Sequence, residues 1–140
     1  MKSTTFLLFT TVLLISSSFS SGVLGDISFE DGKYSEVRKL AKEKNKTIFI
    51  DGYTQWCGPC KKMASTVFTD TEVGSYFNRN FINVKMDMEK TEGMLVGRRY
   101  GVNFYPTLLF IKPSGELVLK EVGYHSKSEP MRLAKDIANY

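Results

Sequence analysis

The 140-residue sequence is poor in the residues that build disulfide frameworks and metal sites, with two cysteines and one histidine, His125. An exported framework protein would carry several spaced cysteines, whereas Cys57 and Cys60 lie close together. A disulfide that closes so short a loop removes little entropy from the unfolded chain, so a purely structural disulfide explains the pair poorly. A zinc site needs four ligands, and only one histidine can join the two thiols. We interpret the pair as redox-active, and the alternatives are a structural disulfide and half of a metal site.

The sequence also lacks a large excess of charge of one sign. Its 19 Lys and Arg residues are offset by 15 Asp and Glu residues, for a formal net charge of +4. The basic residues are scattered among acidic ones, whereas a nucleic-acid partner would require a basic stripe. We therefore expect no nucleic-acid partner. The sequence has no internal repeat or low-complexity segment, and its length suits one domain.

The main apolar run, residues 6–15, lies near the N-terminus. It follows Lys2 and precedes a Ser-rich stretch and the small-residue site that ends at Gly25, which is the order of a secretory signal peptide. The run is too short to span a bilayer comfortably, and an uncleaved membrane anchor is the alternative. We expect a signal peptide over residues 1–25 and a domain over residues 26–140. Export would place the cysteine pair in a compartment where disulfides persist.

Hydrophobic periodicity predicts alternating helices and strands. The expected strands cover residues 47–53, 81–87, 107–111 and 117–123, and the expected helices cover residues 33–46, 91–100, 128–139 and a segment from the cysteine pair to about residue 69. A further short helix is expected after a cap at Asp70 or Thr71, with Val73, Tyr76 and Phe77 on its apolar face. This order predicts an α/β sandwich around a mostly parallel sheet, with antiparallel pairing added by the last hairpin. Residues 27–29 are a candidate edge strand. Phenylalanines at positions 29, 49, 68, 77, 81 and 110 are expected in the core.

The sequence resembles a known family in one motif and four further features. The motif is WCGPCK, and the further features are Asp51 six residues before Cys57, Lys85 within NVKMD, YPT at residues 105–107, and Gly123. With these features the sequence resembles the thioredoxin family over roughly residues 33–140. It is similar in particular to exported members such as the C-terminal domain of the transmembrane thiol–disulfide interchange reductase. The resemblance implies a thioredoxin fold, with a central mixed sheet of about four or five strands flanked by helices.

The resemblance implies that Cys57 attacks a substrate disulfide and that Cys60 resolves the mixed disulfide. We expect Cys57 in the first turn of a helix, where free N–H groups and the helix dipole stabilise a thiolate. Cys60, three residues later, places its sulfur on the same side of the helix, at a distance that suits a disulfide. Gly58 permits close approach of a substrate chain, and Pro59 removes one N–H. No cofactor is needed.

Asp51 interrupts an apolar strand, and the resemblance makes it a buried carboxylate. A buried carboxyl has a raised pKa, so we expect it to accept the Cys60 proton directly or through a water molecule. Lys85 is expected to tune Asp51. The alternatives are a solvated aspartate at the strand end and a plain surface lysine.

The remaining candidates would bind the substrate. Trp56 is expected to pack beside the cysteines and shield them, with a core role as the alternative. The resemblance implies a cis peptide bond before Pro106, which would bring the backbone of Tyr105 next to the sulfurs. That backbone can pair with an extended substrate peptide. Gly123 would close the last hairpin. Tyr53 and Tyr105 replace residues usual in the family at the substrate groove.

The residues between the two cysteines predict the direction of electron flow. Gly58-Pro59 is the pair found in thioredoxin, and strong oxidants carry a histidine there, so the resemblance favours a periplasmic disulfide reductase. Its partners would be protein substrates with disulfides or oxidised thiols and a membrane-embedded thiol electron donor, and the protein would be a monomer. The alternatives are a disulfide oxidase or isomerase with the same pair, and a non-catalytic thioredoxin-like binding module.

Overall fold

The computed structural model describes residues 25–138 as one α/β unit. Its elements, in chain order, are α1 (Tyr34–Lys44), β1 (Thr47–Tyr53), α2 (Gly58–Thr66), α3 (Thr71–Asn80), β2 (Phe81–Asp87), α4 (Thr91–Tyr100), β3 (Thr107–Ile111), β4 (Leu117–Val122) and α5 (Ser128–Ala138). The predicted signal peptide, apart from Gly25, lies outside the described residues. Within those residues, no helix has the length and apolar character needed to cross a membrane.

The strands form one mixed sheet in the order β2-β1-β3-β4. β1 and β2 are parallel, whereas β3 pairs antiparallel with both β1 and β4. The mixed sheet that the family resemblance implied is therefore confirmed, whereas the mostly parallel sheet expected from the order of the elements is wrong. A parallel crossover must carry the chain back along the sheet. Here β2 ends opposite Tyr53 and β3 begins opposite Gly52, so the segment that contains α4 starts and finishes at the same end of the sheet. β3 therefore runs antiparallel to β1.

The predicted edge strand at residues 27–29 is wrong. These residues form no strand, and the next residue, Glu30, makes a single parallel bridge with Val84 of β2. The sheet therefore has four strands, at the lower end of the expected range.

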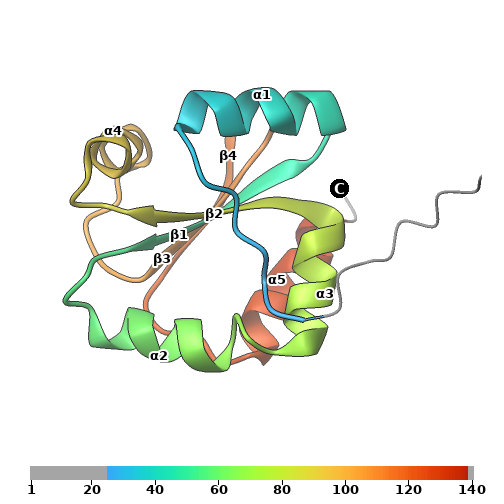
Figure 1. Ribbon diagram of the computed structural model, residues 1–140, viewed down its shortest axis with the longest axis vertical. Coiled ribbons are helices and arrows are strands. Elements are labelled where there is room, and N and C mark those ends of the chain that lie inside the picture. Colours follow the sequence, from blue (N-terminus) through green and yellow to red (C-terminus); the bar gives the residue numbers. More distant parts are fainter. Residues whose placement is uncertain (1–24, 139–140) are drawn as a thin grey trace, which may run out of the picture.

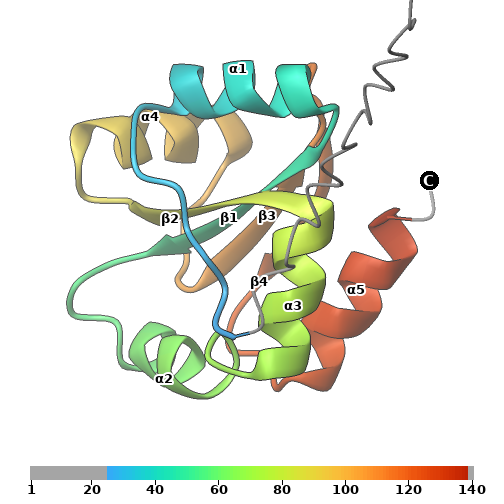
Figure 2. The same cartoon turned by 45° about the vertical axis from the view of Figure 1, so that its right-hand side comes forward.

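Helices cover both faces of the sheet. Figure 1 shows α1 and α4 on one face and α2, α3 and α5 on the other, and the turned view in Figure 2 shows the same layers. Because side chains alternate along β1, Phe49 packs toward α2, α3 and α5, while Ile48 and Ile50 pack toward α1 and α4. Five of the six expected core phenylalanines are buried, and Phe29 is partly buried against them.

Residues at the helix ends account for most of the predicted boundaries. Asn45 and Gly101 end α1 and α4 in the left-handed conformation. Asp70 caps α3, because its carboxylate accepts the N–H groups of Glu72 and Val73. α2 ends at Thr66 rather than Thr69, before the chain reaches this cap.

Candidate functional site

The two cysteines lie where β1 leads into α2. Cys57 is the residue before the first helical position, so it caps the helix rather than lying within its first turn. The sulfurs are joined in a disulfide with an S–S distance of 2.04 Å and a Cα–Cα distance of 5.3 Å. The N–H group of Cys57 is held by the carbonyl oxygen of Thr54 at 3.2 Å. The pair is thus fixed both to the helix and to the loop that follows β1.

The sequence around the disulfide explains its hydrogen bonding. An N-cap side chain ordinarily accepts the N–H of the second or third helical residue. The second is Pro59, which has no N–H, so the sulfur of Cys57 accepts the N–H of Cys60 at 3.2 Å. Gly58 is the first helical residue, and a side chain added there would meet no atom within 4 Å. The space beside Gly58 is therefore open to a partner.

Trp56 lies at the rim of the site. Its side chain is 68% exposed, which excludes the core role considered from the sequence. Its indole N–H donates to the carboxylate of Glu89 at 2.9 Å, and its ring meets that of Tyr105 edge-on at 6.0 Å. Both cysteines beside it are nearly buried, at 3% and 4% exposure.

Hydrogen bonds connect the loop between β1 and α2 to the end of β2, and the sequence did not predict them. The amide of Gln55 donates to Asp87 at 3.1 Å, and Asp87 also accepts the N–H of Glu89 at 3.0 Å. The N–H of Met88 donates to the carbonyl of Tyr53 at 2.8 Å. These contacts depend on the alignment of β1 with β2, so only a known strand register could have revealed them.

Asp51 is buried on the central strand, as expected. Its side chain is 1% exposed, and neither carboxylate oxygen has a hydrogen-bond partner in residues 25–138. Burial raises the pKa of Asp51 to about 7, and the positive charge of Lys85 opposes this rise. The alternative of a solvated aspartate at the strand end is wrong.

Lys85 is aligned with Asp51 across the β1–β2 pair. Its side chain is exposed and makes no ion pair with any carboxylate of the described chain. Its ammonium group lies 4.9 Å from the centre of the Tyr53 ring. The charge of Lys85 lowers the pKa of Asp51 without an ion pair between the two side chains.

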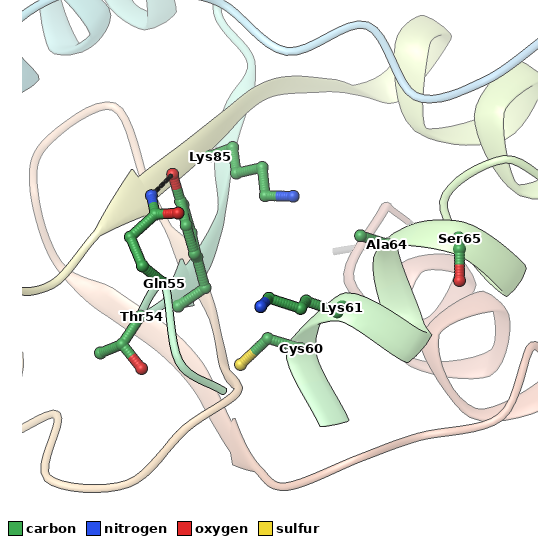
Figure 3. Close-up of a pocket in the computed structure, with 8 residues that line it drawn as sticks. Thr54, Gln55, Cys60, Lys61, Ala64, Ser65 and Lys85 are labelled. Carbon is green, nitrogen blue, oxygen red and sulfur yellow. Dashed lines mark hydrogen bonds between the residues drawn. The ribbon is translucent and has the colours of Figure 1, made fainter. Parts of the chain in front are cut away.

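A pocket of about 440 Å³ opens beside Cys60. Figure 3 shows side chains of β1, β2, α2 and the loop between β1 and α2 around this space. The side chains of Lys61 and Lys85 extend into the space between the sheet and α2, and the sulfur of Cys60 points from α2 toward the loop that follows β1. The pocket lining comprises Tyr53, Thr54, Gln55, Cys60, Lys61, Ala64, Ser65 and Lys85.

The loop before β3 has the expected cis peptide bond between Tyr105 and Pro106. Gly123 follows β4 with a φ of 99°, and its N–H donates to the carbonyl of Pro106 at 2.8 Å. The hydroxyl of Thr107 donates to the carbonyl of Phe104 at 2.7 Å. The structure therefore joins the cis-proline loop to Gly123 and, through the contact of Tyr105 with the exposed indole, to the cysteine loop.

Comparisons with known proteins agree with this geometry. A family model described as a thioredoxin-like domain matches residues 34–138. Thioredoxin H4 of Arabidopsis thaliana is 36% identical over 95 residues, which cover 68% of this chain and 75% of that protein.

Two solved structures are similar in fold. The solution structure of a Bacteroides thetaiotaomicron protein provisionally described as a disulphide-isomerase is 46% identical, with a TM-score of 0.71 over 79% of this chain and 92% of that one. The reduced C-terminal domain of Neisseria meningitidis DsbD shares the fold at 20% identity, with a TM-score of 0.60 over 73% of this chain and 90% of that one. The chain belongs to the family of thioredoxin-like domains and is a thiol–disulfide oxidoreductase with Cys57 and Cys60 as its redox pair.

Proposed function

We propose that the protein is a disulfide reductase. The observation that carries this proposal is the hydrogen bonding around Cys57. A strongly oxidising pair has a reduced form that its surroundings stabilise, which requires donors to the attacking thiolate. Here the second helical residue is Pro59, and the cap bond to the sulfur of Cys57 comes from the N–H of Cys60. A thiolate at Cys57 would thus gain limited stabilisation, which favours the disulfide form and the donation of electrons.

The reaction would proceed through a mixed disulfide. The Cys57 thiolate attacks one sulfur of the substrate disulfide, and the other substrate sulfur leaves with the electron pair and takes up a proton. Cys60 then attacks the sulfur of Cys57, and the substrate departs as a dithiol. The product is the Cys57–Cys60 disulfide seen in the structure.

Asp51 is proposed as the acceptor of the Cys60 proton, with Lys85 as the group that tunes it. Its oxygens are buried and unpartnered within residues 25–138. A carboxyl with a pKa near neutrality is suited to exchange a proton at physiological pH, and the pKa of Asp51 is about 7.

The substrate is proposed to lie across the rim of the site. The backbone of Tyr105, before cis Pro106, would pair with an extended peptide, as in strand addition. Trp56 would cover one side of the peptide, and the open space beside Gly58 would admit its backbone. Gly123 would act indirectly, by holding the carbonyl of Pro106.

The cellular setting is a proposal drawn from the sequence. Residues 1–25 would direct export to the periplasm, and residues 26–140 would form the domain, acting as a monomer. Reduction outside the cytoplasm needs a supply of electrons, so a membrane-embedded thiol donor would regenerate the dithiol. N-terminal sequencing of the exported protein tests the signal, and cleavage elsewhere than after Gly25 would contradict the proposed boundary.

Trapping of the mixed disulfide tests the mechanism. Cys60→Ser should accumulate covalent complexes with a disulfide-bonded peptide, whereas Cys57→Ser should accumulate none because it lacks the attacking thiol. Insulin reduction with an added dithiol should proceed for the wild-type protein and fail for both variants. A wild-type protein without insulin-reducing activity would instead support the non-catalytic binding module.

An isomerase is the second candidate, favoured by the description of the 46% identical Bacteroides thetaiotaomicron protein. Refolding of a protein with scrambled disulfides separates the two functions. An isomerase would restore native pairing, whereas a reductase would release free thiols without raising the yield of native protein.

A further inference from the structure

Asp87 is a buried carboxylate that the mechanism proposed above does not use. It ends β2 opposite Tyr53, and its side chain is 9% exposed. A buried carboxylate costs free energy unless hydrogen bonds replace the lost water. The backbone of Asp87 is well fixed, because its carbonyl oxygen accepts the N–H of Lys90 at 3.0 Å and a Cβ at Gly93 would lie 2.0 Å from that oxygen. Asp87 is therefore a rigid point between β2 and α4.

The two side-chain oxygens of Asp87 accept hydrogen bonds from two different segments. Oδ2 accepts the side-chain amide of Gln55 at 3.1 Å, and Oδ1 accepts the backbone N–H of Glu89 at 3.0 Å. The carboxylate of Glu89 in turn accepts the indole N–H of Trp56 at 2.9 Å. Gln55 and Trp56 are the two residues that precede Cys57 in the chain. One carboxylate thus holds both of them, the first directly and the second through Glu89.

The exposure of Trp56 explains why such support matters. Its side chain is 68% exposed, and Glu89, which accepts its indole N–H, is an exposed residue as well. Exposed side chains change rotamer within nanoseconds unless contacts hold them. A side chain held in its bound conformation before the partner arrives loses less entropy on binding. The bond from Asp87 to the backbone of Glu89 fixes the base from which the Glu89 carboxylate reaches the indole.

We propose that Asp87 is a positioning residue for substrate binding, which orients Trp56 at the rim of the site and thereby lowers the KM of thiol–disulfide exchange. The inference rests on the proposed function, in which Trp56 covers one side of the substrate peptide. Asp87 takes no part in proton or electron transfer, so its loss should weaken binding and spare the chemical step. A loss of this kind raises KM and leaves kcat unchanged.

Kinetics of Asp87→Ala test the inference, with a disulfide-bonded peptide as substrate and an added dithiol as the electron source. KM should rise about fivefold, the net effect of one ordinary hydrogen bond, while kcat stays within about twofold of wild type. Asp87→Asn should keep KM within about twofold, because its amide oxygen can accept the N–H of Glu89 and its amide nitrogen can donate to a turned Gln55 amide. A fall in kcat at unchanged KM, or an asparagine variant as impaired as alanine, would overturn the inference.

The fluorescence of Trp56 gives a readout that a purely structural role would not change. The sequence has one tryptophan, so fluorescence anisotropy reports on Trp56 alone. Asp87→Ala should lower the anisotropy, although the indole N–H donates to Glu89 and not to Asp87. A variant that lost stability but kept the wild-type anisotropy and KM would show that Asp87 only stabilises the fold, and would overturn the inference.

Asp70→Ala is the matched control. The Asp70 carboxylate also accepts backbone N–H groups, but it caps α3. Its loss should lower stability and leave the KM and the anisotropy of Trp56 unchanged. A fall in anisotropy in this control would mean that any loss of stability loosens Trp56, which would overturn a specific role for Asp87.

Two further variants keep the inference falsifiable. Gln55→Ala replaces Asp87→Ala if that protein does not fold, because Gln55 is exposed. It removes one of the two bonds to Asp87, so KM should rise about twofold and the anisotropy should fall, and unchanged values would overturn the inference. In a Trp56→Ala background, Asp87→Ala should raise KM no further, and a full rise of about fivefold there would contradict an action through Trp56.

The same experiments separate this inference from the function on which it depends. If the wild-type protein reduces no peptide disulfide, the proposed reductase function fails, whereas the anisotropy of Asp87→Ala still tests whether Asp87 holds Trp56. If Trp56→Ala leaves KM unchanged, the proposed substrate surface is wrong, and the inference fails with it. If Trp56→Ala raises KM but Asp87→Ala does not, only the positioning role of Asp87 is wrong.

Discussion

Asp51 should make the oxidised protein less stable as the pH rises. Burial raises its pKa to about 7 from an ordinary value of 3.8, with Lys85 opposing the rise. The folded protein therefore binds the proton more tightly than the unfolded chain does. Below the ordinary value the carboxyl is protonated in both states, and its contribution to stability is fully present. That contribution is lost as the pH rises toward and through about 7.

The size of the effect follows from the shift in pKa. The difference between the two values is roughly 3 units, and each unit corresponds to about 1.4 kcal/mol. Wild-type protein should thus lose roughly 4 kcal/mol of unfolding free energy between about pH 4 and pH 8, relative to a variant without the carboxyl. Because Asp51 is 1% exposed, solvent screening does not require a large discount.

Urea unfolding of oxidised wild-type protein and Asp51→Asn across this pH range measures the difference. Other groups titrate in both proteins, so the difference isolates Asp51. Asp70→Asn is the control. A hydrogen bond from Lys127 lowers the pKa of Asp70 below its ordinary value of 3.8, so the stability difference between wild type and this variant should stay flat between pH 5 and pH 8 and change only at more acidic pH.

A difference between wild type and Asp51→Asn that stays flat from pH 5 to pH 8 would refute this reasoning. A variant that becomes relatively less stable toward pH 8 would refute it as well. Either result would mean that folding does not raise the pKa of Asp51. Asp51 would then be unsuited to accept the Cys60 proton.

Three further variants test the geometry of the site. Pro59→Ala adds an N–H at the second helical position, so the attacking thiolate gains a donor and the equilibrium with glutathione should shift about tenfold toward the dithiol. Glu89→Ala removes the acceptor of the Trp56 indole, so the anisotropy of the single tryptophan should fall, at a stability cost below about 1 kcal/mol. Gly93→Ala places a Cβ 2.0 Å from the carbonyl oxygen of Asp87, so the free energy of unfolding, measured by thermal unfolding, should fall by about 1–3 kcal/mol.

Each variant has an outcome that contradicts its premise. An unchanged glutathione equilibrium in Pro59→Ala would show that the missing donor does not set the direction of electron flow. Unchanged anisotropy in Glu89→Ala would mean that the indole is held by other contacts. Gly58→Ala is the matched control for Gly93→Ala, because its Cβ meets no atom within 4 Å. Equal stability of these two variants would contradict the close packing at the start of α4.

The sequence predicted the strands better than it predicted their directions. The bounds of β1, β2 and β3 agree because each strand is an apolar β-rich segment next to a helix with a recognisable end, such as Asn45 or Gly101. Periodicity carries no information on strand direction. The antiparallel placement of β3 depends on how α4 returns the chain, which became known only from the register of Gly52 with Thr107.

In the candidate site, too, the sequence predicted local features but not the contacts between distant segments. Local sequence and the family resemblance identified Cys57, Cys60 and cis Pro106. They did not identify the bond between Gln55 and Asp87, because that contact joins segments far apart in the chain.

An equilibrium redox titration of the Cys57–Cys60 pair against glutathione tests the central claim most directly. As reference values, thioredoxins have potentials of about −270 mV and the strong periplasmic oxidants about −120 mV. A reductase requires a value near the thioredoxin end, at which the pair stays largely oxidised except in strongly reducing mixtures. A value near the oxidant end would contradict the account, because the pair would then accept electrons from its clients.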